Sequence, residues 1–409
     1  GMSAECNMYH PATPLCGPNG GCVECLTNDN CDAVHKTCSP TNTCVPCVDN
    51  SDCASGLCKA GACADKTMVV YVDNATGHGC SDAAGAGTFA MPFCTLQKGL
   101  NAGAMASKPV VVFAGTYPEN VLASISLNGG NDYVVTLVGI GGPVIKPSSS
   151  GPAFSVAGTS GKQVTASVDG FVLDGSTLTD GSNVIECSGN SGGVYGGTLL
   201  TMTRSTIKNG SGVGLSTTQK CVITFDADIF TGNKAGAALL SATDFAFTNL
   251  LVHDNGGSGA SCGGISLASA GETGKMTMFN LTIVNNTAMT GALASGMLCA
   301  VSPTNVTNTL ILGNSPLATE VNTNCHPDFS AFLGATGSNN ETIPATGCGV
   351  NDLLADPPNG DYRPKKMTVK PCTLIDQGTN TGAPDHDLAG TSRPQPASGT
   401  DDIGAYEAK

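Results

Sequence analysis

The stretch Met276–Asn286, MTMFNLTIVNN, contains the pattern that decides the fold: an apolar residue followed three positions later by Asn. Side chains alternate before that apolar residue, and a period of two predicts a strand rather than a helix. The pattern returns along the chain at Phe230 and Asn233, Val252 and Asn255, Ile283 and Asn286, Ile311 and Asn314, with a looser copy, TIKN, at Ile207 and Asn209.

The repeat has a short period with insertions. Its reference aliphatic positions are Ile207, Ile229, Val252, Ile283 and Ile311, which gives steps of 22, 23, 31 and 28 residues. Such a period indicates a solenoid, in which each unit buries its apolar face only by stacking on the next. Propeller blades need roughly 40–45 residues and the leucine-rich consensus is missing. The sequence therefore predicts an all-β fold, a parallel β-helix.

Alternation also predicts which side chains face the interior. Counting back from each aliphatic position gives two inward columns, because successive strand residues point to opposite faces. These columns are Ser205, Ala227, Leu250, Leu281 and Thr309, and then Thr203, Phe225, Thr248, Phe279 and Thr307. The outward column between them is Arg204, Asp226, Asn249, Asn280 and Asn308. We interpret the recurrent Asn as a structural residue just past each strand, where it tolerates left-handed backbone and can bond the amides of neighbouring turns.

The composition agrees with turn-rich β structure. Charged residues are only 12% of the chain, Gly numbers 54 and Trp is absent, whereas ordinary domains carry about 25% charged residues. The formal net charge of -14 disfavours nucleic acids and anionic membranes as partners. A weakly acidic surface rich in Asn, Thr and Ser fits an extracellular protein that meets neutral or basic glycans.

The chain has 20 Cys, 11 of them before residue 64. This density implies disulfides and an oxidising compartment, so we expect a secreted or surface-exposed protein. Two repeated units follow one another: Cys25, Cys31, Cys38 and Cys44, then Cys47, Cys53, Cys58 and Cys63. Zinc is the alternative, because Cys22/Cys25 and Cys44/Cys47 are both C-x-x-C pairs, but each pair spans a junction between repeats. The units resemble the short Cys-rich modules of secreted and surface proteins from myxobacteria.

The remaining cysteines are nine, an odd number as in the N-terminal module. If every thiol is oxidised, one disulfide should join the module to the body. The pairing within the module and the partners of Cys187, Cys221, Cys262, Cys299 and Cys372 are not decided by the sequence. No signal peptide or membrane span is visible, and the opening Gly1-Met2 is typical of a cloning remnant, so we expect that a targeting segment was removed.

Both ends of the solenoid carry further signals. The segment from Thr95 to Ser107 predicts a helix with Thr95 as N-cap, which would cover the open apolar end of a solenoid. The run from YVD (71–73) through PFCTLQKGL (92–100) to AGTYPENV (114–121) resembles the opening of right-handed parallel β-helix proteins of the pectate-lyase-like superfamily. The motifs IDQG (375–378), DLAGTSRP (387–394) and DIGAYE (402–407) resemble the ending of its surface-anchored bacterial members.

The resemblance implies a bridge between Cys80 and Cys94. We also expect Cys325 to pair with Cys348. Like Cys80 and Cys94, these two cysteines bracket one irregular loop near an end of the solenoid. The predicted organisation is a disulfide-rich module at 1–66, a parallel β-helix at 67–314 with its capping helix near 95–107, and an irregular segment at 315–409 that packs on or completes the β-helix.

One surface patch is a candidate catalytic site. Asp226 and Asp228 lie two residues apart on a predicted strand, so their Cα atoms should be roughly 6.6 Å apart on one face. Arg204 should stack one turn before Asp226, and Lys208 and His253 should point outward one residue past the aliphatic positions. Paired carboxylates serve hydrolysis, and calcium with basic side chains serves elimination. The alternative interpretation is a surface ion pair between Arg204 and Asp226.

Two other patterns bear on function. Asp385-His386-Asp387 suggests a metal site, although Asp387 belongs to the DLAG ending. An outward apolar stripe should be covered by the segment from Ser315 to Gly399, with contact between copies of the chain as the alternative. The stripe consists of Phe230, Leu251, Val284, Leu310 and Leu312.

These patterns favour a structural or adhesive β-helix protein that binds an extracellular polysaccharide or cell-surface component. The alternative is a polysaccharide lyase or glycoside hydrolase, but the catalytic Asp pairs and Arg-rich motifs of those enzymes are missing at matching positions. A third hypothesis is a module that binds another protein through its Cys-rich repeats. We predict no cofactor; calcium would enter only with elimination chemistry.

Overall fold

The computed structural model describes residues 15–17, 21–27, 30–31, 37–75, 77–124, 132–158, 162–189, 197–218, 220–271, 273–316, 320–333, 340–343, 348–366 and 373–408. The chain divides into two compact units. The first comprises Gly1–Gly115 with Val135–Pro143, and the second comprises Thr116–Val134 with Val144–Lys409.

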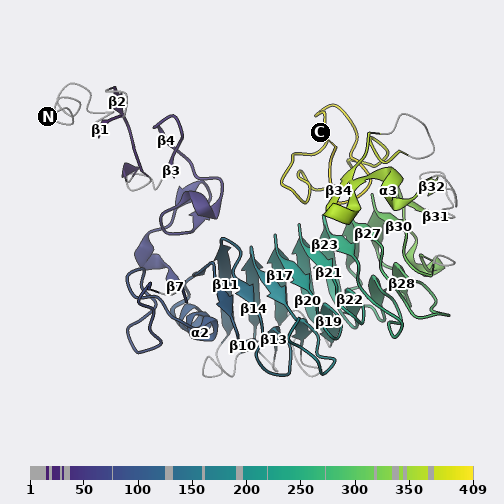
Figure 1. The fold of residues 1–409 in the computed structure, drawn as a ribbon, viewed down its shortest axis with the longest axis horizontal. Helices are drawn as coiled ribbons and strands as arrows, with labels where there is room; N and C mark the ends of the chain where they lie inside the picture. Colours follow the sequence, from purple (N-terminus) through teal and green to yellow (C-terminus); the bar gives the residue numbers. More distant parts are fainter. Residues whose placement is uncertain are drawn as a thin grey trace. The chain divides into compact units, whose positions relative to one another are not determined.

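The second unit is a coil of parallel strands, each paired with the equivalent strand one turn further on (Figure 1). The long sheet contains β14 (Val164–Asp169), β17 (Thr198–Thr203), β20 (Cys221–Asp226), β23 (Asp244–Thr248), β26 (Met276–Phe279) and β29 (Asn305–Thr307). The ladder sheet contains β9 (Thr116–Tyr117), β12 (Val144–Ile145), β15 (Val172–Asp174), β18 (Thr206–Lys208), β21 (Ile229–Thr231), β24 (Leu251–His253), β27 (Thr282–Val284), β30 (Leu310–Leu312), β31 (Ala331–Leu333) and β32 (Glu341–Ile343). The third sheet contains β10 (Val121–Ser124), β13 (Phe154–Ala157), β16 (Ile185–Ser188), β19 (Leu215–Thr218), β22 (Ala238–Leu240), β25 (Ile265–Leu267) and β28 (Met297–Cys299). The predicted parallel β-helix is confirmed.

Stacked apolar columns fill the interior of this coil. In the long sheet the inward column is Val168, Met202, Phe225, Phe247, Met278 and Val306. In the ladder sheet it is Leu173, Ile207, Phe230, Val252, Ile283 and Ile311. Phe225 packs on Phe230 and Phe247 with ring centroids 5.8 and 5.7 Å apart. Each turn therefore buries its side chains against the turns before and after it, as a solenoid requires.

The recurrent Asn residues form a buried ladder, as predicted from turn chemistry. Asn233, Asn255, Asn286 and Asn314 are at most 1% exposed. The Oδ1 atom of Asn286 accepts hydrogen bonds from the backbone N–H and side-chain amide of Asn255, both at 3.0 Å. The side-chain amide of Asn286 donates to Asn314 Oδ1 at 2.9 Å and to the Val252 carbonyl at 3.0 Å. The role of the recurrent Asn is thus to satisfy backbone groups in the corner that follows each ladder-sheet strand.

The left-handed residue at this corner is not the recurrent Asn but the residue before it. These residues have φ between 54° and 72° and are Gly232, Asp254, Asn285 and Gly313. In the looser copy Asn209 is itself left-handed, with φ 59°, and Gly210 takes the ladder position by donating its N–H to Asn233 Oδ1. The prediction that the recurrent Asn adopts the left-handed conformation is therefore wrong, because that conformation lies one residue earlier.

A second left-handed column separates the long sheet from the ladder sheet and corrects the predicted faces. It consists of Arg204, Ala227, Asn249, Asn280 and Asn308, with φ between 51° and 58°. A left-handed residue breaks strand alternation, so counting back across it shifts the faces by one residue. Thr203, Thr248, Phe279 and Thr307 consequently pair with Asp226 along an outward column rather than facing the interior. Asn249, Asn280 and Asn308, expected to point outward, are fully buried in this corner.

The same break in alternation determines that Phe230, and not Ile229, faces the interior of the coil. Phe230 pairs with Ile207 and Val252 in the inward column and is 1% exposed. Ile229 pairs with Leu251 and is only partly buried. The predictions that Ile229 is the core reference and that Phe230 belongs to the outward stripe are therefore wrong.

The first unit contains the disulfide-rich module and the predicted helix. Its short strands are β1 (Leu15–Cys16), β2 (Cys22–Val23), β3 (Thr37–Cys38), β4 (Cys44–Val45), β5 (Cys58–Lys59) and β6 (Ala62–Cys63), and η2 (Asn50–Asp52) and η3 (Lys66–Met68) are single 3₁₀ turns. Strands β7 (Val70–Val72) and β8 (Val110–Phe113) are parallel, and β8 pairs with the second half of β11 (Tyr133–Ile140). Helix α2 (Leu96–Ala106) begins after Thr95, which confirms the helix. It packs so closely on β7 that a Cβ at Gly99 would lie 2.1 Å from a Val72 methyl group.

The described disulfides confirm the two cysteine units and exclude zinc at them. Each unit pairs its first cysteine with its third and its second with its fourth: Cys25–Cys38, Cys31–Cys44, Cys47–Cys58 and Cys53–Cys63. Cys22 is disulfide-bonded as well. Both C-x-x-C pairs are therefore occupied by bridges. The second cysteine unit (Cys47, Cys53, Cys58 and Cys63) packs on β7, where the Tyr71 hydroxyl donates to the Ser55 carbonyl at 3.2 Å.

The body bridges agree with the expectations only in part. Cys80 pairs with Cys94, as predicted, with Cα atoms 5.0 Å apart. Cys325 pairs with Cys299 rather than with Cys348, because Cys299 ends β28 and the next turn of the coil brings η5 (Thr323–Cys325) beside it. Cys187 pairs with Cys221, whereas Cys262 is a buried free thiol. The predicted disulfide between the module and the body required every cysteine to be oxidised, and the free thiol of Cys262 shows that this condition is not met.

The C-terminal segment packs over the outward apolar stripe. It contains α3 (Val350–Leu353), β33 (Leu354–Asp356), η6 (Pro357–Asn359) and β34 (Asp361–Pro364), followed by irregular chain with turns and bends from 373 to 408. Leu251, Val284, Leu310 and Leu312 form one cluster with Leu353, Leu354, Tyr362, Leu374 and Ile403. In the described part of the chain no helix is long and apolar enough to cross a membrane.

We predict that the ladder contributes strongly to stability. Asn286→Ala removes the partner of the Asn255 N–H and takes the side-chain donor away from the Val252 carbonyl and from Asn314 Oδ1, so it should lower the free energy of unfolding by about 2–4 kcal/mol. The matched control is the preceding residue. Asn285 has φ 57°, which Gly adopts freely, so Asn285→Gly should change stability by less than about 1 kcal/mol. Chemical denaturation of both variants is the measurement; equal losses would show that the buried amide is not what holds the corner.

Candidate functional site

The predicted catalytic patch does not assemble. Asp228 is fully buried and its Oδ1 accepts the backbone N–H of Ser205 at 2.7 Å, whereas Asp226 lies on the outward column. Left-handed Ala227 stands between them, with φ 58°. The prediction that both carboxylates share one face is therefore wrong, and they cannot act as a paired acid and base.

The basic residues of the patch have other partners. Arg204 forms a two-point ion pair with Asp169 of β14, with Nε–Oδ1 at 2.8 Å and Nη2–Oδ2 at 2.5 Å. The predicted Arg204–Asp226 pair is wrong, because Asp169 ends its strand beside the corner that Arg204 occupies. Lys208 is partly exposed in register with Asp174. Exposed pairs of this kind contribute about 0–1 kcal/mol, so they serve the surface rather than a site.

Asp226 instead meets His386 of the C-terminal segment. His386 Nε2 lies 2.9 Å from Asp226 Oδ2, and its Nδ1 lies 2.8 Å from Asp385 Oδ1. Burial alone would lower the pKa of His386, but its contacts with Asp385 and Asp226 outweigh burial and raise the pKa. Two motifs far apart in the sequence thus form one link, in which the His386 imidazole ties the C-terminal segment to the long sheet.

Asp387 serves as a structural residue, not as a metal ligand. Its Oδ1 accepts the N–H groups of Ala389 and Thr391 at 2.9 and 2.6 Å, and its Oδ2 accepts that of Glu407 at 3.0 Å. Among the described residues, the only groups of three convergent ligand-type side chains are cysteines that form disulfides. The Asp385-His386-Asp387 run therefore gives no support for a metal centre.

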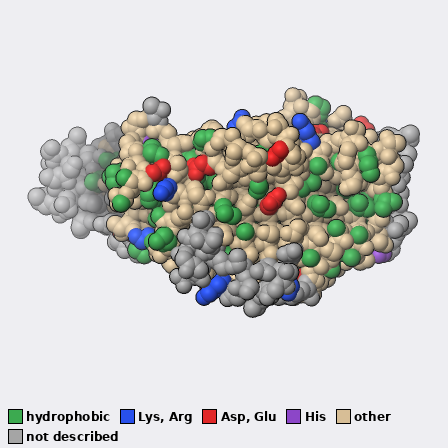
Figure 2. All heavy atoms as spheres, turned by 90° about the horizontal axis from the view of Figure 1, so that it is seen from below, with side chains coloured by type: hydrophobic (Ala, Val, Ile, Leu, Met, Phe, Trp, Pro, Cys, Tyr) green, Lys and Arg blue, Asp and Glu red, His purple; other side chains and the backbone are tan. Residues whose placement is uncertain are grey.

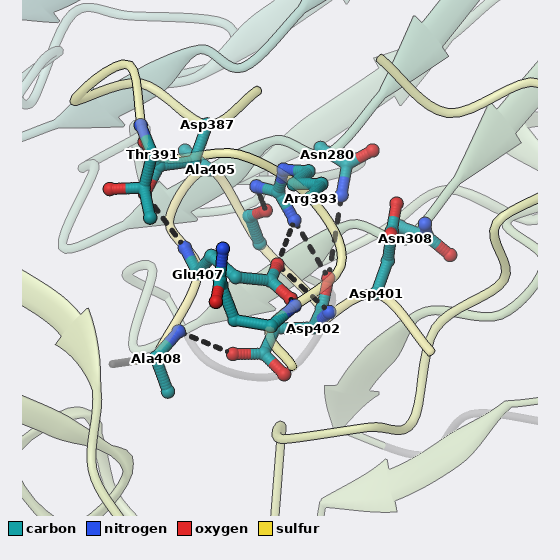
Figure 3. A network of polar contacts seen from close by, with 12 residues as sticks. Asn280, Asn308, Asp387, Thr391, Arg393, Asp401, Asp402, Ala405, Glu407 and Ala408 are labelled. Carbon is teal, nitrogen blue, oxygen red and sulfur yellow. Dashed lines mark hydrogen bonds and ion pairs between the residues drawn. The ribbon is translucent and has the colours of Figure 1, made fainter. Parts of the chain in front are cut away.

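The two C-terminal motifs close around a buried ion pair, seen in Figure 3. Arg393 Nη1 and Glu407 Oε2 are 2.7 Å apart and both side chains are fully buried. Arg393 also donates to the Gly404 carbonyl at 2.9 Å, and Glu407 accepts the Gln395 N–H at 2.9 Å. Burial lowers the pKa of Arg393 and raises that of Glu407. Since every contact is internal, this cluster fixes the segment and offers nothing to a ligand.

A polar pocket lies beside this segment. It has a volume of about 540 Å³ and is lined by Asp254, Asn285, Gly349, Val350, Asn351, Asp352, Pro357, Pro358 and Tyr362. Asp254 and Asn285 are the left-handed residues that follow β24 and β27, so their side chains leave the coil at successive turns. Asn351 and Asp352 come from α3, and the two prolines from η6. We refer to this feature as the polar pocket.

One side chain of the predicted patch, His253, supports the wall of the polar pocket. Its Nδ1 lies 2.7 Å from Asp254 Oδ2 and 2.9 Å from the Tyr362 hydroxyl. Burial and the nearby Asp254 carboxylate raise the pKa of Tyr362, so the phenol stays protonated. Tyr362 is therefore a hydrogen-bond donor in this wall and not a base.

The lining residues of the polar pocket escaped the sequence prediction. Asp254 and Asn285 occupy the position before the recurrent Asn, which the repeat marks only as variable. A left-handed corner residue that is polar and unlike its neighbours is the signal that could have found them. The residues of α3, η6 and β34 reach the pocket only through tertiary packing.

Comparisons with known proteins give a limited result. No family model matches the chain, and no curated protein matches it. A solved structure, the crystal structure of pectate lyase Pel9A, is similar with a TM-score of 0.47 and 14% sequence identity. The alignment covers 84% of this chain and 99% of that one.

We predict that Asp228 destabilises the fold at neutral pH. Burial raises the pKa of this carboxyl well above its ordinary value, and its Oδ2 has no hydrogen-bond partner within the described part of the chain. The folded state therefore holds the proton more tightly, and stability falls as pH rises from the unfolded value near 4 through the raised one. Asp228→Asn should match the parent near pH 4 and exceed it at neutral pH by about 1–3 kcal/mol.

Asp226→Asn is the matched control, because it removes the partly exposed carboxylate that contacts His386. It should be slightly less stable than the parent at neutral pH, by about 0–1 kcal/mol. Denaturant titrations across the pH range compare the two. Parallel pH profiles for both variants would contradict the interior position of Asp228.

Proposed function

We propose that this chain is a non-catalytic, glycan-binding β-helix protein of the extracellular space, with an adhesive or structural role. The polar pocket carries the proposal. Carboxylates and side-chain amides suit sugar hydroxyls, and ligand sites combine a few such groups with apolar surface. Asp254, Asn285 and Asn351 supply the polar groups, and Pro357 and Pro358 supply apolar faces.

The charge of the polar pocket favours neutral or amino-sugar glycans over uronic acid polymers. Of its described lining residues, two are acidic and none is basic. The chain as a whole carries a formal charge of -14. A polyanion would meet like charge at close range, which costs affinity and slows encounter. Seen from below (Figure 2), the surface carries few charged side chains, with hydrophobic ones dispersed among uncharged groups, which fits contact with an uncharged polymer.

The bonding of the acidic groups argues against cleavage. Asp352 Oδ2 accepts the Gly349 N–H at 2.8 Å at the start of α3, and Asp254 is held by His253 and Tyr362. Elimination needs a basic side chain or calcium beside the reacting sugar, and the described lining of the polar pocket offers no basic group. In the predicted catalytic patch, Asp228 is buried and Arg204 is bound to Asp169.

An extracellular location is supported by the disulfides. The described chain contains bridges in both the Cys-rich module and the body, including Cys47–Cys58 and Cys299–Cys325. Such bridges persist in oxidising environments and are rare in the cytosol. A short module held by bridges suits a spacer or contact element at a cell surface, because units of this size cannot bury a core of their own.

We predict binding without turnover. On an array of neutral, amino-sugar and uronate glycans, the protein should bind within the first two classes, and Asn351→Ala should weaken that binding about tenfold because it removes a pocket amide. Asn359→Ala is the control: Asn359 is exposed in the same segment, bonds Asp356 at 2.7 Å and does not line the polar pocket. It should bind like the parent.

Cleavage is measured on the same glycans, and on pectin, alginate and chondroitin, by release of reducing ends and unsaturated products with and without calcium. We expect none. Turnover that disappears in Asp254→Asn would replace the adhesive function with a lyase or hydrolase. Binding that Asn351→Ala leaves unchanged would remove the polar pocket from the proposal.

A further inference from the structure

A second pocket, lined mostly by apolar groups, lies wholly within the first unit. Its volume is about 480 Å³, within the range of roughly 300–1,000 Å³ that holds small organic ligands. It is lined by Lys66, Thr67, Val69, Val70, Ala86, Gly87, Thr88, Phe89, Ala90, Phe93, Ala102, Ala106 and Lys108. We refer to it as the apolar pocket.

The walls of the apolar pocket are held by ordered structure. One wall is the helix α2, where the small side chains of Ala102 and Ala106 leave room above β7. Another part of the lining is the Phe89 ring, which packs edge-on against Tyr71 with centroids 5.2 Å apart. Left-handed Gly87 lets the loop pass over Phe93, since a Cβ there would lie 2.4 Å from the Phe93 ring. The cavity is therefore built in advance of any ligand.

Two cationic groups are the polar feature of this cavity. Lys66 Nζ lies 4.4 Å above the centroid of the Phe89 ring. Lys108 Nζ donates to the Thr67 carbonyl at 2.7 Å, and an ammonium group has three protons to donate. None of the lining residues that the structure describes is acidic, although the whole chain has a formal charge of -14. The adjacent Asp65 turns its carboxylate to the Thr67 N–H and hydroxyl, both at 2.7 Å.

From this arrangement we infer that the apolar pocket binds a small amphipathic carboxylate, an apolar chain or ring that ends in a single anionic group. The apolar body would lie between Phe89 and α2, and the carboxylate would accept hydrogen bonds from Lys108 and meet the charge of Lys66. Three methionines next to lining residues in the sequence are available at the surface: Met68, Met91 and Met105 are 58%, 37% and 71% exposed. Methionine-rich surfaces adjust to ligands of varied shape.

The test uses decanoate, below its micelle concentration, and decanol as a neutral partner of the same length. Calorimetry on the full chain should show saturable binding of decanoate, with decanol at least about tenfold weaker because it lacks the charge-assisted bonds. Lys108→Gln should weaken decanoate binding about tenfold and leave decanol binding unchanged. Lys98→Gln is the control, because Lys98 is exposed on α2, which forms one wall, and does not line the apolar pocket.

Ala102→Leu fills the cavity while keeping a good helix former, so it should abolish binding of both probes at an unchanged melting temperature. Absence of decanoate binding overturns the inference. So does equal binding of acid and alcohol, or binding that survives Ala102→Leu. Self-association of the parent that Ala102→Leu abolishes, measured by light scattering, would assign the cavity to a second copy of the chain and also overturn it.

Discussion

The buried side-chain amide of the recurrent Asn is the interaction on which the rest of the second unit depends. Where the chain leaves the ladder sheet, its backbone N–H groups have no strand partner, and a buried N–H without a partner costs about 1–3 kcal/mol. Each Asn supplies that partner from the next turn, as Asn255 Oδ1 does for Asn233 at 3.1 Å. Since the Asn residues of successive turns must bond one another, every turn keeps the same number of residues between its ladder-sheet strand and its Asn. Insertions are confined to other corners, which explains a repeat of variable length.

The two left-handed columns follow from the same geometry and create the places where function can vary. A coil that turns through one residue needs positive φ there, which Gly and Asn adopt most readily. The side chain at such a corner leaves the stacked core, so its chemistry is not fixed by packing. Asp254 and Asn285 use this freedom to line the polar pocket, while Gly232 and Gly313 leave the same position bare.

The sequence predicts the features that repeat and fails where repetition is interrupted. The period identified the strands, the ladder Asn residues and the buried Phe225 because each is marked several times. Ala227 and Arg204 carry no mark of left-handed backbone, unlike Asn249 and Asn280 in the same column, so alternation was carried through them and Asp228 was placed on the wrong face. The contact of His386 with Asp226 joins residues 160 positions apart, and no local pattern announces it. Cys325 was paired by nearness along the chain, whereas stacking of turns selects Cys299.

Buried carboxylates mark the places where the repeating bonds end. Glu320 accepts the N–H of the last ladder residue, Asn314, at 2.8 Å, and burial raises its pKa to about 7. Beyond it the chain continues as a segment that must lie in one position over an apolar stripe, and apolar contact alone is not directional. The Arg393–Glu407 pair supplies direction instead: desolvation offsets much of its Coulomb attraction, but its bonds to Gly404 and Gln395 close only in one register. Ile403, which lies between the two ion-pair residues in the sequence, packs in one cluster with Leu353 and Tyr362, so the register that the pair selects also positions residues at the polar pocket. The costly buried charges are therefore best understood as positioning the pocket rather than as stabilising the coil.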